Sequence, residues 1–145
     1  MTKPSISLFG YGRFGKLFAD ILQDFYSIEV FDPNHTSDSI SSVAFVSEEK
    51  ALTNDTIIYA VPIAHFKDLF NKHLHLLKTP KTLIDVLSVK CLPKEVFQSA
   101  KEKGHTALLT HPMFGPDSVK RDGLTGQTIA IDSSLSDPDL SLIHI

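Results

Sequence analysis

Hydrophobic positions along the chain follow two alternating patterns. Short apolar runs predict buried strands, and apolar positions three and four residues apart predict helices with one buried face. The runs predict strands at residues 6–9, 28–31, 43–46, 56–61, 82–87, 106–110 and 127–131. The helical spacing predicts helices at residues 14–22, 48–52, 64–77 and 93–103. The polar stretch 33–42 is expected to be a loop with at most a short irregular helix.

Strands that alternate with helices predict an α/β fold. The pattern implies a doubly wound, mostly parallel sheet with right-handed crossovers and helices on both faces. In such sheets, ligands bind beyond the carboxyl ends of the strands. The loops at 61–63, 88–90 and 111–116 each follow a predicted strand. We therefore expect these loops to line one crevice, together with the turn that follows the first strand.

The first strand leads directly into a glycine turn. Residues 10–15 read Gly-Tyr-Gly-Arg-Phe-Gly, which matches G-x-G-x-x-G where a strand gives way to a helix. Gly10 would permit the tight turn, Gly12 would let a pyrophosphate approach the backbone, and Gly15 would let the helix pack closely on the strand. The N–H groups of the first helical turn and the helix dipole would favour a phosphate. The alternative is a glycine turn that only packs the strand against the helix.

An acidic residue follows the second predicted strand. Asp32 lies 22 residues after Gly10, where a carboxylate can accept hydrogen bonds from the adenosine ribose hydroxyls. A 2′-phosphate would meet this negative charge with no arginine after it, because the next residues are Pro33, Asn34 and His35. The sequence therefore predicts NAD in preference to NADP. The residues expected to contact the cofactor are Gly10, Gly12, Arg13, Phe14, Gly15, Asp32, Val61 and Pro62.

Composition narrows the class of protein. The 145 residues suffice for one domain with a real core and not for two. Lys and Arg number 14 against 17 Asp and Glu, so the net charge of -3 provides no basic face for nucleic acid. No apolar run approaches the ~20 residues of a membrane helix, and the first strand follows Met1 too closely for a signal peptide. The single cysteine, Cys91, favours a reducing, cytoplasmic location.

Two residues in the predicted crevice loops are candidates for proton transfer. His111 follows an apolar strand and precedes Pro112, whose ring restricts His111 to an extended backbone. A neutral imidazole can accept a proton near neutral pH. Ser88, after the preceding strand, could hold that imidazole or a substrate hydroxyl in place. The pair suits removal of a hydroxyl proton as a hydride leaves the same carbon, and the alternative for His111 is a loop histidine that bonds only backbone.

The remaining histidines give no metal-binding pattern. His73 and His75 point to different sides of a helix, and no cysteine or acidic residue completes the spacing of a metal site. We expect no metal, and we expect these histidines to be solvated or to cap helices.

Two runs in the crevice loops resemble a known family. They are residues 85–90, Asp-Val-Leu-Ser-Val-Lys, and about twenty residues later residues 111–118, His-Pro-Met-Phe-Gly-Pro-Asp-Ser. Both resemble the prephenate and arogenate dehydrogenases of tyrosine biosynthesis, and the glycine turn and the strand end at 60–62 stand in the order expected for that family. The resemblance covers nearly the whole chain, and its histidine run is far more specific than the glycine turn.

The resemblance implies a Rossmann-type domain and an oxidative decarboxylation. Prephenate would give 4-hydroxyphenylpyruvate, or arogenate would give tyrosine, as NAD accepts hydride and the ring carboxylate leaves as carbon dioxide. His111 would accept the proton of the ring hydroxyl, and Ser88 would orient the histidine, the hydroxyl and the nicotinamide. Asp117 matches an acidic position near the entrance to the site, with a gating or hydrogen-bonding role. The sequence leaves the choice of substrate open.

Members of this family continue into a helical domain that forms the dimer and closes the active site. Residues 1–132 are therefore expected to form the dinucleotide-binding domain, and the polar tail 133–145 to begin the missing helical part. A homodimer is expected only with that part. Two alternatives stay open. One is a non-catalytic dinucleotide-binding module or truncated relic, and the other is an imino acid or hydroxy acid dehydrogenase.

Overall fold

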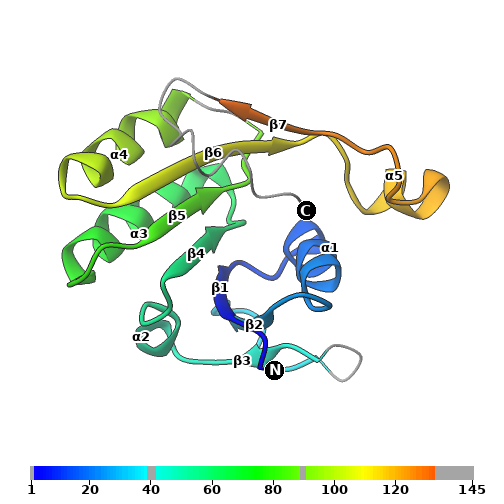
Figure 1. The fold of residues 1–145 in the computed structure, drawn as a ribbon, viewed down its shortest axis with the longest axis horizontal. Helices are drawn as coiled ribbons and strands as arrows, with labels where there is room; N and C mark the ends of the chain where they lie inside the picture. Colours follow the sequence, from blue (N-terminus) through cyan, green and yellow to red (C-terminus); the bar gives the residue numbers. More distant parts are fainter. Residues whose placement is uncertain (1, 39–41, 89–90, 133–145) are drawn as a thin grey trace.

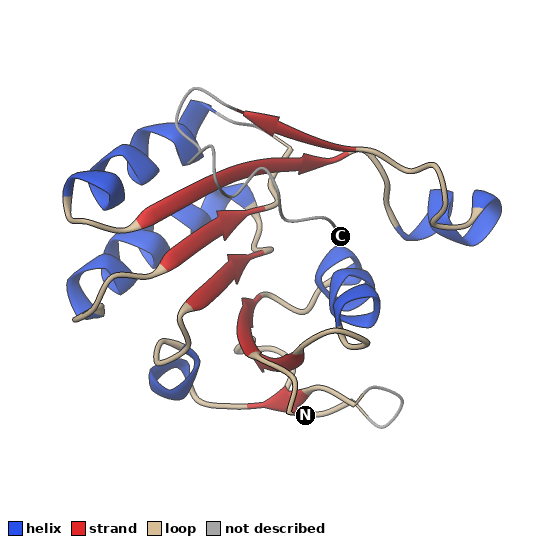
Figure 2. Ribbon diagram, viewed as in Figure 1, coloured by secondary structure: helices blue, strands red, loops and turns tan. Residues whose placement is uncertain are grey.

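Strands and helices alternate along the chain in this computed structural model, which describes residues 2–38, 42–88 and 91–132 (Figure 1; Figure 2). The strands are β1 (Ser5–Phe9), β2 (Ser27–Phe31), β3 (Ala44–Phe45), β4 (Thr56–Tyr59), β5 (Thr82–Asp85), β6 (Thr106–Pro112) and β7 (Ile129–Asp132). The helices are α1 (Arg13–Leu22), α2 (Glu48–Ala51), α3 (Ile63–Leu76), α4 (Cys91–Glu102) and α5 (Pro116–Asp122). The predicted tail at 133–145 lies outside the described residues.

All seven strands form one sheet in the order β3-β2-β1-β4-β5-β6-β7. Every neighbouring pair is parallel except β6 and β7, which are antiparallel. The chain builds outward from β1 in one direction and from β4 in the other, so the strand order reverses between these two strands. The predicted mostly parallel, doubly wound sheet is confirmed, and its reversal point is where such sheets bind ligands.

Helices pack on both faces of the sheet. On one face, α3 and α4 contribute Phe66, Phe70 and Phe97, which are buried against Phe9 and Tyr59 of the sheet. The opposite face is covered by α1, whose core residues Phe18, Ala19 and Leu22 pack against β1 and β2. Figure 1 shows α3 and α4 together on one side of the sheet and α1 on the other. Helical cover is therefore uneven, and part of the α1 face lies beyond the reach of α1.

β6 is longer than the sequence indicates. We predicted that it would end at Thr110 and that His111 would begin a loop, but the strand continues to Pro112. The extra length comes from β7, which returns antiparallel and places Ala130 opposite His111 and Ile129 opposite Pro112. The prediction that His111 lies in a loop was wrong because this pairing partner comes from a distant part of the sequence.

The short helix α5 was not predicted. It begins after Gly115 with Pro116 in its first turn, and the Ser118 hydroxyl accepts a hydrogen bond from the Gly115 N–H at 2.9 Å. It ends at Gly123, whose φ of 78° lies in the left-handed region. No residue of α5 is buried. The helix therefore has no apolar periodicity that would predict it. Its only sequence signals are the proline in its first turn and the glycine after its last residue.

His73 is buried rather than solvated. Its Nδ1 lies 2.8 Å from the Tyr59 hydroxyl and its Nε2 lies 2.9 Å from Oε1 of Glu48. A carboxylate accepts only, so Nε2 carries the proton and Nδ1 accepts from Tyr59. Burial lowers the pKa of His73 more than its hydrogen bond to Glu48 raises it. The expectation of a solvated histidine was wrong because its partners come from other elements, β4 and α2.

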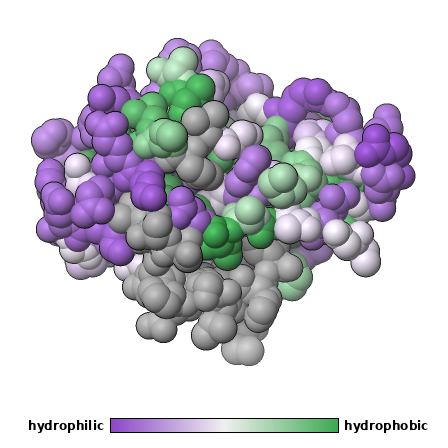
Figure 3. Space-filling model, turned by 90° about the horizontal axis from the view of Figure 1, so that it is seen from above, coloured by the Kyte–Doolittle hydropathy of each residue, from purple (hydrophilic) through white to green (hydrophobic). Residues whose placement is uncertain are grey.

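Much of the surface is hydrophilic, as the view from above shows, with smaller hydrophobic groups between (Figure 3). Among the helices that the structure describes, none is long and apolar enough to cross a bilayer.

Candidate functional site

The glycine turn connects β1 to α1 at the reversal point of the sheet. Gly10 has a φ of 99°, and a Cβ on it would lie 2.3 Å from the carbonyl oxygen of Ala60. A Cβ on Gly15 would lie 2.3 Å from the carbonyl oxygen of Gly10. These two positions therefore admit only glycine for reasons of packing. A Cβ on Gly12 would meet nothing within 4 Å, so Gly12 faces open space.

The start of α1 has the features of a phosphate-binding helix terminus. Gly12 is its N-cap, no side chain caps it, and its first turn contains no acidic residue. The terminal N–H groups of a helix and the helix dipole favour an anion at this place. The chain thus leaves both the space in front of Gly12 and the helix terminus available to a pyrophosphate, which is the fit that a dinucleotide requires.

Asp32 lies directly after β2 and is tied to the glycine turn. Its Oδ2 accepts a hydrogen bond from the N–H of Tyr11 at 2.7 Å, and its Oδ1 accepts one from the N–H of Asn34 at 2.8 Å. The His35 Nδ1 lies 3.4 Å from Oδ1. Partial burial raises the pKa of Asp32, but these hydrogen bonds outweigh it and leave the pKa below its ordinary value. The carboxyl group is therefore held as a fixed negative charge.

A crevice of about 460 Å³ lies beyond the carboxyl ends of the central strands. It is lined by the start of α1 and by the segments that follow β4, β5 and β6. Four of the predicted site residues line it: Arg13, Phe14, Val61 and Ser88. Residues of all three predicted loops therefore meet at one crevice, with Ser88 as the only described residue of the loop 88–90, because residues 89 and 90 lie outside the described part of the chain. Gly10, Gly12, Gly15, Asp32, Pro62, His111 and Asp117 are not among the lining residues.

Ser88 and His111 lie at the carboxyl ends of β5 and β6, which are parallel neighbours in the sheet. Ser88 lies three residues beyond the end of β5 and is exposed, whereas His111 is the penultimate residue of β6 and is half-buried. No hydrogen bond joins these two described side chains. The orienting role predicted for Ser88 stays a prediction.

A salt bridge and an aromatic pair connect α1 to α5 beside the crevice. Nη2 of Arg13 lies 2.7 Å from Oδ1 of Asp117, and both side chains are exposed. The rings of Phe14 and Phe114 have centroids 6.2 Å apart. Asp117 therefore engages a residue predicted to contact the cofactor, although it does not line the crevice itself.

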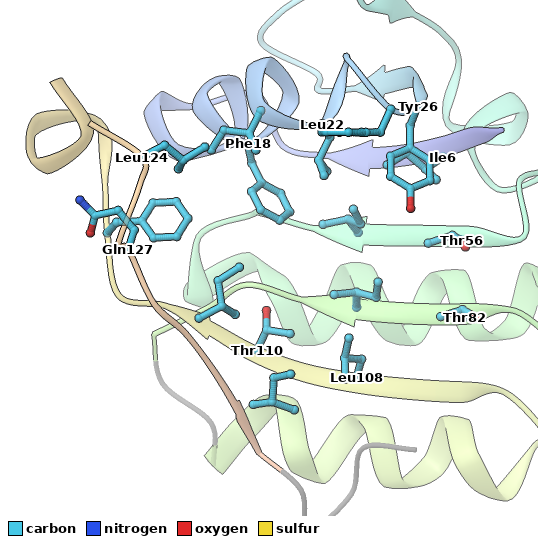
Figure 4. A pocket seen from close by; sticks show the side chains of 17 residues that line it. Ile6, Phe18, Leu22, Tyr26, Thr56, Thr82, Leu108, Thr110, Leu124 and Gln127 are labelled. Atoms are coloured by element: carbon cyan, nitrogen blue, oxygen red, sulfur yellow. The ribbon is translucent and has the colours of Figure 1, made fainter. Parts of the chain in front are cut away.

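A second cavity, of about 510 Å³, lies on the part of the sheet that α1 leaves uncovered (Figure 4). Its lining is largely apolar and includes Phe18 and Leu22 of α1, Leu108 of β6, and Leu124. It carries no acidic, basic or histidine side chain. The polar side chains of this apolar groove are therefore limited to tyrosine and threonine hydroxyls and the Gln127 amide. Among the described residues there is also no cluster of three or more His, Cys, Asp or Glu that could hold a metal.

Tyr11 is a site residue that sequence reasoning missed. Its ring is buried, its N–H bonds Asp32, and its hydroxyl donates to Oδ2 of Asp38 at 2.9 Å. Lys16 of α1 lies 3.3 Å from the same oxygen of Asp38. Tyr11 occupies an unspecified position of the glycine pattern, so the pattern carries no signal for it. It joins the glycine turn to the loop after β2.

The fold and the crevice define a Rossmann-type nucleotide-binding domain. The family described as prephenate dehydrogenase, nucleotide-binding domain, matches residues 36–131, which is most of the chain. The chain belongs to this family. The glycine turn precedes the matched range and adds the expected phosphate-binding element to it.

Known relatives agree with this assignment. Arogenate dehydrogenase 2, chloroplastic, of Arabidopsis thaliana is 28% identical over an alignment of 122 residues, and the match covers 79% of this chain and 34% of that protein. The chain therefore spans about a third of the length of this relative. A solved structure of a putative prephenate dehydrogenase from Corynebacterium glutamicum has a TM-score of 0.63 at 18% identity, covering 79% of this chain and 38% of that one.

The same fold occurs in a dehydrogenase of another kind. The NAD-dependent formate dehydrogenase of Staphylococcus aureus, in complex with NAD, has a TM-score of 0.58 at 24% identity. The match covers 73% of this chain and 34% of that one. At this level of identity the likeness concerns the fold alone.

Proposed function

We propose that this chain binds NAD in preference to NADP and is the cofactor-binding part of a prephenate or arogenate dehydrogenase. The observation that carries the proposal is the crevice at the reversal point of the sheet, where Arg13 and Phe14 at the start of α1 meet the segments after β4, β5 and β6. We assign residues 1–132 to this dinucleotide-binding domain.

The preference for NAD rests on Asp32. Its carboxyl group is fixed by two backbone N–H groups and is charged at neutral pH, since its pKa lies below the ordinary value. It would accept hydrogen bonds from ribose hydroxyls and repel a 2′-phosphate. Gly10, Gly12 and Gly15 would shape the phosphate site, Arg13 and Phe14 would contact the cofactor from α1, and Val61 and Pro62 from the segment after β4.

In the proposed reaction the nicotinamide supplies the hydride acceptor. His111 accepts the proton of the ring hydroxyl, and Ser88 positions the hydroxyl and the imidazole. Loss of the ring carboxylate as carbon dioxide then gives an aromatic product, 4-hydroxyphenylpyruvate from prephenate or tyrosine from arogenate. Asp117 acts near the entrance, where its salt bridge to Arg13 gates the crevice.

The proposal also covers the substrate class, the cellular location and the oligomeric state. One Arabidopsis relative is named arogenate dehydrogenase, and a Methanocaldococcus jannaschii relative is named probable arogenate/prephenate dehydrogenase. The single cysteine supports a cytoplasmic location, and a small-molecule substrate, without nucleic acid or membrane, fits the charge and the crevice. A homodimer is proposed only for a form that carries a helical domain.

Calorimetric titration of the chain with NAD and with NADP tests the cofactor preference. Asp32→Ser removes the charged acceptor, so NAD affinity should fall about tenfold to a hundredfold and the preference over NADP should shrink. Asp24→Ser is the matched control, because it makes the same charge change at an exposed position just after α1. Equal affinities for NAD and NADP in the unaltered chain would overturn the preference.

Turnover of prephenate and of arogenate tests the catalytic part. It is measured on the longest form of the protein that its gene encodes, with His111→Asn as the variant. Loss of turnover by about a hundredfold or more is expected for a proton acceptor. Unchanged turnover in His111→Asn would refute the role of His111 as the proton acceptor. NAD binding without any turnover would favour the non-catalytic dinucleotide-binding module.

A further inference from the structure

A buried side chain joins the ends of β5 and β6. Asp85 is the last residue of β5 and has no exposed surface. Its Oδ1 accepts a hydrogen bond from the N–H of Thr110 at 3.2 Å, and its Oδ2 accepts one from the N–H of Leu87 at 3.3 Å. The Thr110 hydroxyl donates to the backbone carbonyl of Asp85 at 2.6 Å. One residue therefore holds both segments just where the strands approach the crevice.

The two segments held by Asp85 are the ones that carry the proposed catalytic pair. Leu87 directly precedes Ser88, and Thr110 directly precedes His111. Because each bonded N–H belongs to the neighbouring residue, the carboxyl group fixes the backbone from which both side chains depart. The pairing of β6 with β7 holds His111 from its other side, but the β5–β6 register ends with Asp85 opposite Leu109, so strand pairing alone does not tie the segment of Ser88 to that of His111.

Only a carboxyl group suits this place. Two N–H donors approach two different oxygens of one side chain, and an asparagine would turn an NH₂ group toward one of them. Burial of a carboxyl group costs desolvation free energy unless the group is hydrogen-bonded. The hydrogen bonds to Thr110 and Leu87 offset this cost. An apolar residue at position 85 would serve the core as well and would leave the N–H of Thr110 and of Leu87 without this acceptor.

We propose that Asp85 is a positioning residue that sets the separation between Ser88, which lines the crevice, and His111, which directly precedes the crevice residue Pro112. The inference rests on the proposed function, because it assigns a purpose to the geometry of that pair. Asp85 acts through the backbone of Leu87 and Thr110 and does not itself exchange a proton with the substrate.

The test compares Asp85→Asn with a destabilising change at the other end of the sheet. The control is Asn54→Ala, which removes part-buried hydrogen bonds from Asn54 to Ser7 and to Glu29. Turnover is measured on the longest gene-encoded form, and urea midpoints are measured in parallel. Asp85→Asn should lower kcat about tenfold to a hundredfold with the KM for NAD changed less than about threefold, since a displacement near 1 Å suffices for such a loss. Asn54→Ala should leave kcat within about twofold.

A second measurement follows the hydrogen bonds directly. Amide hydrogen exchange at Leu87 and Thr110 should be at least about tenfold faster in Asp85→Asn, with no change at Gly10, whose N–H bonds Phe31. Thr110→Val removes only the hydrogen bond from the Thr110 hydroxyl to the Asp85 carbonyl. It replaces Asp85→Asn as the test variant if Asp85→Asn does not fold. It should lower kcat by a smaller factor, again without a matching change in KM.

The outcomes separate this inference from the proposed function. A loss of kcat in Asp85→Asn no larger than in Asn54→Ala overturns the positioning role, as does faster exchange with unchanged kcat. If His111→Asn abolishes turnover and Asp85→Asn does not lower it, only the positioning role fails. If His111→Asn leaves turnover unchanged, the proposed function fails and the positioning role falls with it.

Discussion

The glycines of the turn differ in what surrounds them. Gly10 and Gly15 are each 2.3 Å from a backbone oxygen at the place of a missing Cβ, whereas Gly12 faces open space. The first two are therefore required by the fold itself, whereas nothing in the packing requires glycine at position 12, where the proposed pyrophosphate would supply the demand. One sequence pattern thus contains two separate physical demands.

This difference predicts opposite outcomes for two alanine variants. Gly10→Ala combines a φ of 99° with a backbone clash, so it should cost about 2–4 kcal/mol of unfolding free energy or prevent folding. Gly12→Ala should change the unfolding free energy by less than about 1 kcal/mol and weaken NAD binding by about tenfold or more. Urea denaturation and calorimetry check the pair. Equal loss of stability in both variants would contradict the assignment.

Among single residues, the sequence predicts those that belong to a spacing pattern or a family motif. It misses those whose role depends on a hydrogen bond to a residue far away in the chain. The glycines, Asp32, Ser88 and His111 were named from spacing or resemblance. Tyr11 and Asp85 stand inside the quoted runs, but the sequence gives no sign of their roles, which arise from hydrogen bonds to residues 21 and 25 positions away.

Two helices meet at the crevice through an exposed pair. Arg13 of α1 and Asp117 of α5 form a salt bridge at 2.7 Å, and an exposed pair of this kind adds little to stability. A phosphate bound at α1 would compete with Asp117 for the guanidinium. The contact between α1 and α5 is therefore expected to affect ligand binding more than folding.

Asp117→Asn should accordingly leave the urea midpoint unchanged and raise NAD affinity by about twofold to fivefold at low salt. The gain should disappear at high salt, because exposed charges are screened. Asp122→Asn is the control, since Asp122 also lies on α5 and pairs with Arg121 instead. A gain of the same size in the control would show a general charge effect.

Three elements are joined by one buried histidine. Glu48 of α2, His73 of α3 and Tyr59 of β4 form a hydrogen-bonded chain. The folded pKa of His73 lies below the ordinary value of 6.5, so the unfolded chain binds the proton first as the pH falls. Stability from this histidine is complete above about pH 6.5 and is lost as the pH falls toward the folded pKa.

His73→Gln should therefore reduce the fall in unfolding free energy between pH 6.5 and 5, by at most about 1.4 kcal/mol per pH unit. His105, whose pKa burial also lowers, contributes the same background in both proteins. His75→Gln, at an exposed position of the same helix, should leave the slope unchanged. Urea denaturation at several pH values measures the slopes, and identical slopes for His73→Gln and the parent would refute the role.

The elements predicted best are those with local signals. Strands β1, β2 and β4 and helix α3 follow from apolar runs and spacing, and their ends differ from the structure by one or two residues. The extension of β6 and the helix α5 were missed because one depends on β7 and the other buries no side chain.

The whole molecule leaves an apolar groove on the sheet face that α1 covers only in part. The groove has a volume of about 510 Å³, and Phe25 and Leu124 at its rim are 63% and 44% exposed. Apolar surface of this extent binds apolar ligands or partners readily.

The chain should therefore bind an apolar fluorescent dye in its native state. Leu124→Asp places a charge at the groove and should lower the dye fluorescence by about half, because Leu124 is one of several lining residues. Leu76→Asp makes the same change at a similarly exposed leucine of α3 that does not line the groove. Fluorescence titration with circular dichroism as a check on folding measures both, and equal decreases would show that the dye binds elsewhere.

The hydrogen bond from the Tyr11 N–H to Asp32 has a consequence for any change of cofactor preference. A substitution made at position 32 to admit a 2′-phosphate also removes the acceptor that anchors the backbone of the glycine turn. Exchange of Asp32 for a small apolar residue is therefore expected to loosen the proposed phosphate site at the same time as it opens the proposed ribose site. Redesign toward NADP in this chain calls for a replacement that keeps an acceptor at the same place, such as serine or asparagine, with the new positive charge introduced from position 33 or 34.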